Sequence, residues 1–309
     1  MSTDKILVRQ TSESILDPGN GVLGRDNFCL PWRNEALRFL TDVSEPMCYP
    51  GKPDQTNRPA AANPTNGQAI SNIAHPAGLL ADGDIRCTAG QVRLIGGALD
   101  FTQTSTAGQG LRLPGEVLAD LHAPYNGLAQ RYMMAMMIRL PKLTDWPATN
   151  NTVSLFGDAA DNTAAPAFGS INLFGHPTIP GAIQVRRQVA ASTTDEFSLF
   201  ATEADCWAQL VLIRWADGRQ TLRLRTPSTL VTRDVPEAGN PGDNVLDFSA
   251  NRLMAGRPSI FASGGVAASS SNLRFGWVAV ANLARDPATD VIGELDKEYT
   301  RVIAQQRFS

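Results

Sequence analysis

The residues best suited to bind a ligand lie in two neighbouring loops. Trp146 stands in a proline-flanked run, LTDWPA (143–148), and an acidic run, DAADN (158–162), follows it. An aromatic ring can stack on the apolar face of a sugar, and carboxylates or amides can bind its hydroxyls. The alternative is that Trp146 packs over the edge of the fold and the acidic run is a solvated turn. The predicted carbohydrate-binding residues are Trp146, Asp158, Asp161 and Asn162.

Two other strings match a known chemistry only in part. The run GNGVLG (19–24) has the glycine spacing of a dinucleotide-binding turn, but Pro18 precedes it and Pro31 ends any helix within two turns. We interpret it as a glycine-rich loop. The run ELDKE (294–298) resembles the paired carboxylates of glucanases. It falls on a predicted helix, which points carboxylates in different directions, so a solvated helix face is the better interpretation.

Histidines and cysteines are too dispersed to form a metal or catalytic site. None of them combines at the spacing of a metal site, and no G-x-S-x-G string is present. We therefore expect no metal, no cofactor and no enzymatic turnover. We interpret the cysteines as buried thiols of a protein made in a reducing cytoplasm. The residues concerned are His75, His122, His176, Cys29, Cys48, Cys87 and Cys206.

Arginines recur on the predicted strands. Arg223 and Arg225 alternate with leucines in the run TLRLR, so the leucines face one side and the arginines the other. With Arg186, Arg187 and Arg219 they are candidates for a face that attracts anionic sugars or a neighbouring subunit. The alternative, which is more common for such stripes, is the solvated face of an outer strand.

Composition narrows the class of protein. The 309 residues carry a net charge of −3, and without a basic excess the chain does not bind nucleic acid by neutralising phosphates. The first residues hold no apolar stretch of signal-peptide length, and no window is long enough to span a bilayer, so we expect no membrane insertion. Only 18% of residues are charged, and 26 Gly and 20 Pro make the chain rich in turns. This profile favours a β-sandwich.

From about residue 91, short apolar runs alternate with turns. Arg131–Leu140 (RYMMAMMIRL) is apolar on both faces, as in a central strand buried between two layers. Trp207–Trp215 (WAQLVLIRW) is a second long strand, and Asp217-Gly218 turns it back into Gln220–Arg225 as a hairpin. Asp286 as N-cap and Pro287 as first helical residue open an amphipathic helix. Further strands are predicted at 92–95, 98–102, 111–113, 152–157, 170–174, 182–186, 196–201, 260–262 and 273–282.

The first 90 residues differ from the rest. Eight of the 20 prolines fall there, and only Lys5–Arg9 and Asn34–Leu40, about two helical turns, show a periodic pattern. Such a segment cannot build its own core, so it must lie on its own domain or on a neighbouring chain. We predict a proline-rich assembly arm over 1–90 and a domain over 91–309 that ends in a helix at about 287–306. The fold class is all-β, a two-sheet antiparallel sandwich with an extended N-terminal arm and a C-terminal helix.

The order of several segments resembles a known group. The segments are Leu99–Phe101 (LDF), Gly110–Pro114 (GLRLP), Arg131–Leu140, Trp207–Leu212 with Asp217-Gly218 after it, and Phe275–Leu283 (FGWVAVANL). In this order they resemble the opening strands, the central strand after a small helix, a hairpin and the last strand of laminin-G-like domains. These domains belong to the concanavalin A-like lectin/glucanase group, and the resemblance covers about residues 91–309.

The resemblance implies a jelly roll that binds glycans or proteins and does not catalyse. No intact glucanase carboxylate string, calcium-ligand cluster or jelly-roll alginate lyase signature is present. Jelly rolls with proline-rich arms are similar to structural virion proteins of tailed bacteriophages, in a tail, baseplate, fibre or decoration, made in the host cytoplasm. The implied partners are other virion subunits through the arm, further copies in a homo-oligomer, and host-surface polysaccharide. Two alternatives stay open: a glycan-active enzyme of the same fold (glycoside hydrolase or polysaccharide lyase), and a structural protein that binds no sugar.

Overall fold

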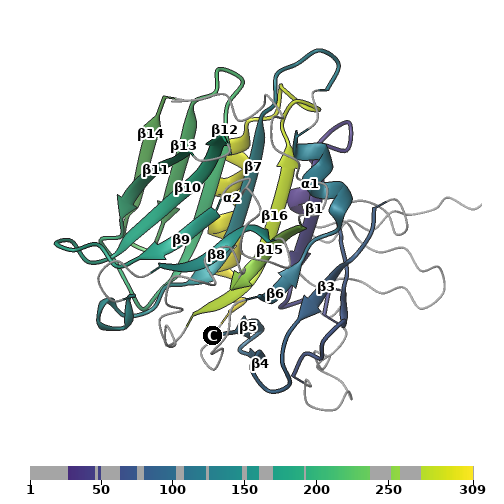
Figure 1. The fold of residues 1–309 in the computed structure, drawn as a ribbon. Helices are drawn as coiled ribbons and strands as arrows, with labels where there is room; N and C mark the ends of the chain where they lie inside the picture. The colour runs from purple at the N-terminus through teal and green to yellow at the C-terminus, as the bar shows by residue number, and fades with distance from the viewer. Residues whose placement is uncertain are drawn as a thin grey trace, which may run out of the picture.

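The computed structural model describes residues 27–45, 48–49, 63–74, 80–101, 108–122, 125–147, 152–159, 170–190, 193–236, 252–257 and 273–308. Two eight-stranded sheets face each other (Figure 1), and the strand pairings in the described residues are antiparallel. The predicted two-sheet antiparallel sandwich is confirmed.

The strands divide equally between the two sheets. Sheet A runs β14 (Leu230–Val235), β13 (Gln220–Arg225), β12 (Trp207–Arg214), β7 (Tyr132–Arg139), β16 (Arg274–Asn282), β5 (Ala98–Asp100) and β4 (Arg93–Ile95), with β1 (Leu37–Asp42) paired to β16. Sheet B runs β11 (Thr193–Phe200), β10 (Ala182–Ala190), β9 (Ser170–Phe174), β8 (Thr152–Ala159), β15 (Arg252–Arg257), β6 (Gln109–Arg112), β3 (Gly83–Arg86) and β2 (Ala69–Ile70). The helices are α1 (Gly115–His122), α2 (Val291–Ala304) and two 3-10 turns, η1 (Asn27–Cys29) and η2 (Leu143–Asp145).

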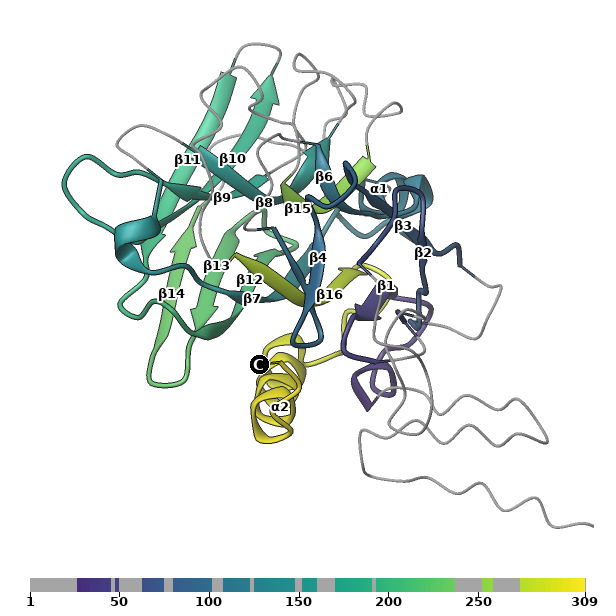
Figure 2. The same ribbon diagram turned by 90° about the horizontal axis from the view of Figure 1, so that it is seen from below.

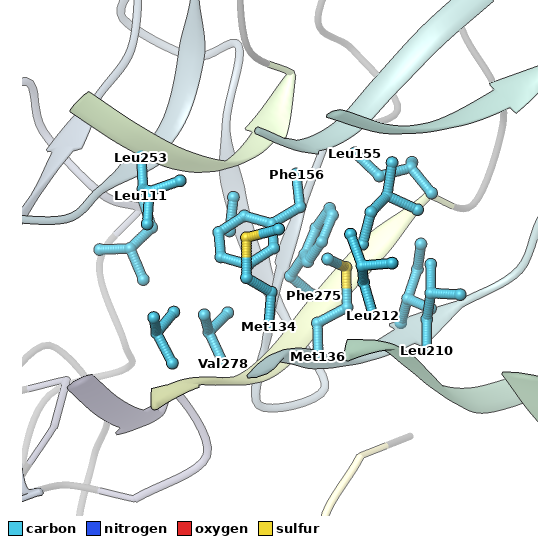
Figure 3. Packing of buried hydrophobic residues seen from close by; sticks show 14 of the residues in the cluster. Leu111, Met134, Met136, Leu155, Phe156, Leu210, Leu212, Leu253, Phe275 and Val278 are labelled. Atoms are coloured by element: carbon cyan, nitrogen blue, oxygen red, sulfur yellow. The ribbon is translucent and has the colours of Figure 1, made fainter. Parts of the chain in front are cut away.

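Strand β7 lies at the centre of sheet A, between β12 and β16, and is buried on both faces. Figure 3 shows Met134 and Met136 among side chains of both sheets, with Phe156 of β8 above them. The alternate residues, such as Met133, enter a second apolar cluster on the outer side of sheet A. A strand with apolar clusters on both faces needs an unbroken apolar run, and this confirms the prediction for RYMMAMMIRL.

Helix α2 covers the outer face of sheet A (Figure 2). Leu295 of the helix is fully buried with Trp277 of β16. Asp296 binds the guanidinium of Arg223 at 2.5 Å and also pairs with Arg225, and the Arg223 side chain is only 3% exposed. No described helix is long and apolar enough to cross a membrane.

The predicted arginine face is therefore wrong. Arg223 is buried beneath helix α2, and Arg225, whose side chain is 28% exposed, is paired with Asp296 of the same helix. Arg219 pairs with carboxylates of its own hairpin, Asp217 and Asp234, while Arg186 belongs to the other sheet. Alternation along the strand predicts that the arginines point away from the leucines. It does not predict that helix α2 packs on the side to which they point.

Helix α2 begins later than its sequence predicts. Asp290 is the N-cap: its carboxylate accepts a hydrogen bond from the Gly293 N–H at 3.0 Å, and the first helical residue is Val291. The carboxylate of Asp286 instead accepts a hydrogen bond from the Arg33 N–H at 2.8 Å. This bond joins the N-terminal segment to the chain that follows β16. The run ELDKE does lie on the helix, as predicted. Only part of it is solvated, since Glu298 is 2% exposed.

The described part of the first 90 residues belongs to the sandwich. Strand β1 pairs with β16, and β2 and β3 extend sheet B, with β3 paired to β6. Of the two surfaces considered for the arm, these residues lie on their own domain. Contact of the arm with other subunits stays a prediction.

The two helical turns predicted at 34–40 are wrong. Asn34 and Glu35 have φ of 50° and 57°, which no right-handed helix allows, and a strand begins at Leu37. Phe39 enters the cluster between the sheets and Leu40 the outer cluster. Because apolar residues are needed on both faces, their spacing imitated a helix.

The residues after α2 close over β1 and β16. The Arg307 guanidinium binds the carboxylate of Asp42, which is fully buried. The Phe308 ring lies over Gly276, where a Cβ atom would come within 2.2 Å of it, and its centroid is 4.7 Å from that of Trp207. We call Arg307 and Phe308 the C-terminal clamp.

Candidate functional site

Trp146 follows η2 and is a core residue. It is 8% exposed, belongs to the cluster between the sheets, and its indole N–H donates to the carbonyl oxygen of Ala182 at 3.1 Å. A buried indole with a satisfied N–H has no face available for a sugar in this conformation. The geometry matches the packing alternative.

The structure does not bring Trp146 and Asp158 together. Ala182, the partner of Trp146, pairs with Phe174, which pairs in turn with Thr152 at the start of β8. Asp158 lies six residues further along β8, opposite Leu253 of β15, about 20 Å along the strand. Trp146 and Asp158 therefore lie near opposite ends of β8. Asp161 and Asn162 lie outside the described residues, so carbohydrate contact by the acidic run stays a prediction.

A cluster of rings lies on the outer face of sheet B, facing away from the core. Phe174 of β9 and Phe200 of β11 both pair with Ala182 of β10, and His176 follows β9. The His176 ring centroid is 6.2 Å from that of Phe174 and 5.4 Å from that of Phe200, with the rings nearly perpendicular. All three rings are half-buried. We call Phe174, His176 and Phe200 the ring cluster.

Strand alternation puts these rings outside. Leu173 and Leu199, the neighbours of Phe174 and Phe200, point into the cluster between the sheets. Successive side chains of a strand point to opposite faces, so the phenylalanines point outward. Ala182 between them is fully buried, and its small side chain forms the floor of the ring cluster.

The turn after β9 fixes the orientation of His176. Its Nδ1 accepts hydrogen bonds from the backbone N–H groups of Thr178 at 3.3 Å and Ile179 at 3.1 Å. An imidazole nitrogen that accepts carries no proton, so Nε2 carries it and is a donor. Nε2 lies on the opposite side of the ring from this turn. The ring cluster therefore includes one hydrogen-bond donor of fixed orientation.

A row of polar side chains continues the face beside the rings. Glu196 of β11 accepts from the Gln184 amide at 3.2 Å through one oxygen and binds the Arg186 guanidinium at 2.5 Å through the other. Ser198 lies opposite Gln184, between Glu196 and Phe200 along its strand. We call Gln184, Arg186, Glu196 and Ser198 the polar row. Rings beside amide, hydroxyl and carboxylate groups are what a sugar-binding surface needs.

The floor beneath the polar row is rigid. Asn172 of β9 is fully buried on the same face, and its amide donates to the Ser170 hydroxyl at 3.1 Å and to the Gln184 carbonyl at 3.4 Å. The first bond lies within β9, and the second links β9 to β10 through a side chain in addition to the backbone ladder. The outer face of β9–β11 is therefore preorganised.

Metal and thiol chemistry finds little support in the described residues. No three potential metal ligands come together there. Cys29 and Cys48 are buried, as predicted, whereas Cys87 and Cys206 are half-buried. Burial raises the pKa of Cys206 to about 11, with the nearby charge of Glu203 adding to it. This thiol is protonated at neutral pH and is a poor nucleophile.

Sequence reasoning missed the ring cluster. Phe174 ends the strand predicted at 170–174, Phe200 lies in the strand predicted at 196–201, and the alternation of both strands was available. Their proximity was not, because it requires knowing that β9, β10 and β11 pair in this register. Gly175, His176-Pro177 and Pro180-Gly181 between the two strands were local signals of a turn there.

Comparison with known proteins identifies the fold. No protein-family model and no curated protein matches the chain. Among solved structures, it is similar to the botulinum neurotoxin serotype D/C VPI 5993 binding domain, with 7% identity and a TM-score of 0.50 over 85% of this chain and 53% of that one. The chain thus spans about half the length of these toxin domains. It has a concanavalin A-like jelly-roll fold.

Two further structures show weaker similarity. One is botulinum neurotoxin type C, whose cell entry depends on two ganglioside molecules, with 8% identity and a TM-score of 0.42 over 85% of this chain and 52% of that one. The other is the Trypanosoma rangeli sialidase in complex with 2,3-difluoro-KDN, with 13% identity and a TM-score of 0.43 over 88% of this chain and 39% of that one. At these identities the likeness concerns the fold alone.

Proposed function

We propose that this chain is a lectin-like domain that binds carbohydrate with the outer face of β9–β11. The observation that supports it is the position of the ring cluster next to the polar row. On sheet A, α2 and the chain around β1 pack on the outer face, and the half-buried ring of Trp215 stacks against the Arg219 guanidinium, 5.3 Å from the ring centroid. Outward rings with adjacent hydrogen-bonding groups match the apolar faces and hydroxyls of a sugar.

A single such site binds weakly. Ring stacking and two or three hydrogen bonds together contribute only a few kcal/mol, which after the loss of translational freedom leaves a Kd in roughly the millimolar range. A weak site is useful where many copies act together, since avidity multiplies the affinity. The proposal therefore includes display in several copies.

The setting we propose is the virion of a tailed bacteriophage. The support is the resemblance of the jelly roll and its proline-rich arm to structural virion proteins, which are present in many copies on one particle. Mass spectrometry of purified particles tests this part. Absence of the chain from particles would remove the virion role and leave the sugar-binding domain.

We propose further that the domain does not catalyse. Glycoside hydrolysis normally uses two carboxyl groups on either side of the bond. Glu196 is the carboxylate described beside the rings, and it is held by Arg186 and Gln184. Release of reducing ends or unsaturated sugars from polysaccharide, abolished in Glu196→Gln, would contradict this and favour the enzyme alternative.

The test of sugar binding is a pair of variants on the ring cluster. Phe174→Ala and Phe200→Ala each remove one half-buried ring, so retention on immobilised polysaccharide should weaken about fivefold to tenfold with little change in Tm. Trp146→Ala is the matched aromatic control. It opens a cavity in the core and should lower Tm, because a buried Trp→Ala change costs about 3–5 kcal/mol of unfolding free energy. Unchanged retention in both phenylalanine variants would refute the proposal.

A further inference from the structure

The charged groups of the polar row already neutralise one another. The Arg186 Nε is 2.5 Å from one oxygen of Glu196, and the Gln184 amide donates to the other oxygen at 3.2 Å. Neighbouring Ser198 and the phenylalanine rings carry no charge. The described part of this face therefore presents one carboxylate and one guanidinium that are joined as a pair.

The ring cluster adds no positive charge. The two backbone N–H groups that donate to Nδ1 of His176 require an acceptor there. An imidazolium, protonated on both nitrogens, has no acceptor, so these two hydrogen bonds are made by the neutral ring. The faces of the phenylalanine rings are electron-rich and repel anions.

We infer that the outer face of β9–β11 selects neutral sugars over carboxylated ones, an inference that rests on the proposed function. A sugar carboxylate entering here meets the carboxylate of Glu196 and must displace it from Arg186 to gain a charged partner. Two carboxylates within contact distance repel each other strongly in a partly buried site. A neutral hexose meets no such penalty. Its ring face covers the phenylalanines, and its hydroxyls accept from His176 Nε2 and donate to Glu196.

The experiment compares matched sugars that differ at one carbon. Galactose, glucose and mannose are immobilised beside galacturonate, glucuronate and mannuronate, in which the C6 hydroxymethyl group is a carboxylate, and retention of the full chain is measured. We expect the wild type to retain at least one neutral member about tenfold better than its uronate partner. This preference should persist at an ionic strength of about 0.5 M, where long-range repulsion between the uronate and the net negative charge of the chain is screened.

Two variants test the mechanism. Glu196→Gln keeps the size and the acceptor oxygen but removes the carboxylate charge from beside Arg186, so retention of the uronate should rise about tenfold, as one charge-assisted hydrogen bond permits. Arg186→Gln, the matched control, removes the guanidinium and should give no such gain. Melting curves confirm that both variants fold. If Glu196→Gln does not fold, the wild-type ratio and its salt dependence decide.

The outcomes separate this inference from the proposed function. Retention of a uronate by the wild type as strong as that of its neutral partner, and lost in Arg186→Gln, would overturn the neutral selectivity while leaving sugar binding intact. No gain of uronate retention in folded Glu196→Gln would also overturn it. Failure to retain any of the six sugars would refute the proposed function itself and the inference with it.

Discussion

The Nδ1 atom of His176 accepts a hydrogen bond from the backbone N–H of Ile179, 3.1 Å away, and thereby holds both the turn and the ring. Asparagine before proline forms a similar turn, since its side-chain oxygen accepts backbone N–H groups two residues on. His176→Asn should therefore keep the turn and remove the ring. We expect an unchanged Tm and sugar retention reduced about fivefold to tenfold.

His176→Ala is the companion variant, because it removes the acceptor as well as the ring. Its Tm should fall below that of His176→Asn, while sugar retention is reduced to a similar extent in both. Equal retention in wild type and His176→Asn would show that the histidine only shapes the turn.

The buried pair of Asp42 and Arg307 predicts a large effect on stability. Arg307→Met leaves the carboxylate of a fully buried Asp42 without its guanidinium, which costs about 3–5 kcal/mol of unfolding free energy. The double variant Asp42→Asn, Arg307→Met has no unpaired charge and should be more stable than Arg307→Met alone. Urea unfolding measures both. Lys297→Met is the control, since Lys297 pairs with Glu294 on the exposed side of α2 and its loss should matter little.

Gly276 predicts a steric coupling with the C-terminal clamp. A Cβ on Gly276 meets the Phe308 ring at 2.2 Å, so Gly276→Ala should destabilise the fold by about 1–3 kcal/mol through overpacking. Phe308→Ala removes the obstacle. The double variant should therefore be less destabilised than the sum of the two single changes, as measured by thermal unfolding. Additive effects would show that the clamp does not depend on this glycine.

Alkaline pH should destabilise the fold. Burial raises the pKa of Cys206 to about 11 and that of Tyr299 to about 12, from ordinary values of 9.0 and 10.0. Between pH 9 and 11 the unfolded thiol has lost its proton and the folded one has not, so unfolding releases a proton and stability falls as pH rises. Cys206→Ser should flatten the fall of Tm over this range. An identical pH dependence in wild type and variant would contradict the assignment.

Long apolar strands, the short apolar strands β4, β5 and β6 and the C-terminal helix were predictable, and strands poor in apolar residues were not. Strand β7 carries apolar residues on both faces, which only a central strand needs. Strands β14 and β15, with sequences LVTRDV and RLMAGR, carry too few apolar residues to stand out, since β14 lies at the exposed edge of sheet A. The run at 260–262, predicted as a strand, lies outside the described residues.

The site shows why local composition was not enough. The loop at Trp146 had the right residue types, but tryptophan next to proline suits the edge of a core equally well. In the structure Trp146 is buried and its indole N–H donates to the Ala182 carbonyl, which matches the packing alternative. Strand 152–157 was predicted between the two candidate loops, and a strand between loops already sets them at opposite ends. Phe174 and Phe200 are 26 residues apart and meet only because both pair with β10.

The pairing of β1 with β16 determines when sheet A can fold relative to synthesis of the chain. Leu37 lies opposite Ala281, about 240 residues later in the chain. At a synthesis rate of roughly 5–20 residues per second, β1 waits about 10–50 s for its partner. During that time Phe39 and its apolar neighbours are exposed in the nascent chain. Sheet A closes only after translation of β16, so we expect its folding to be largely post-translational and limited by this long-range pairing.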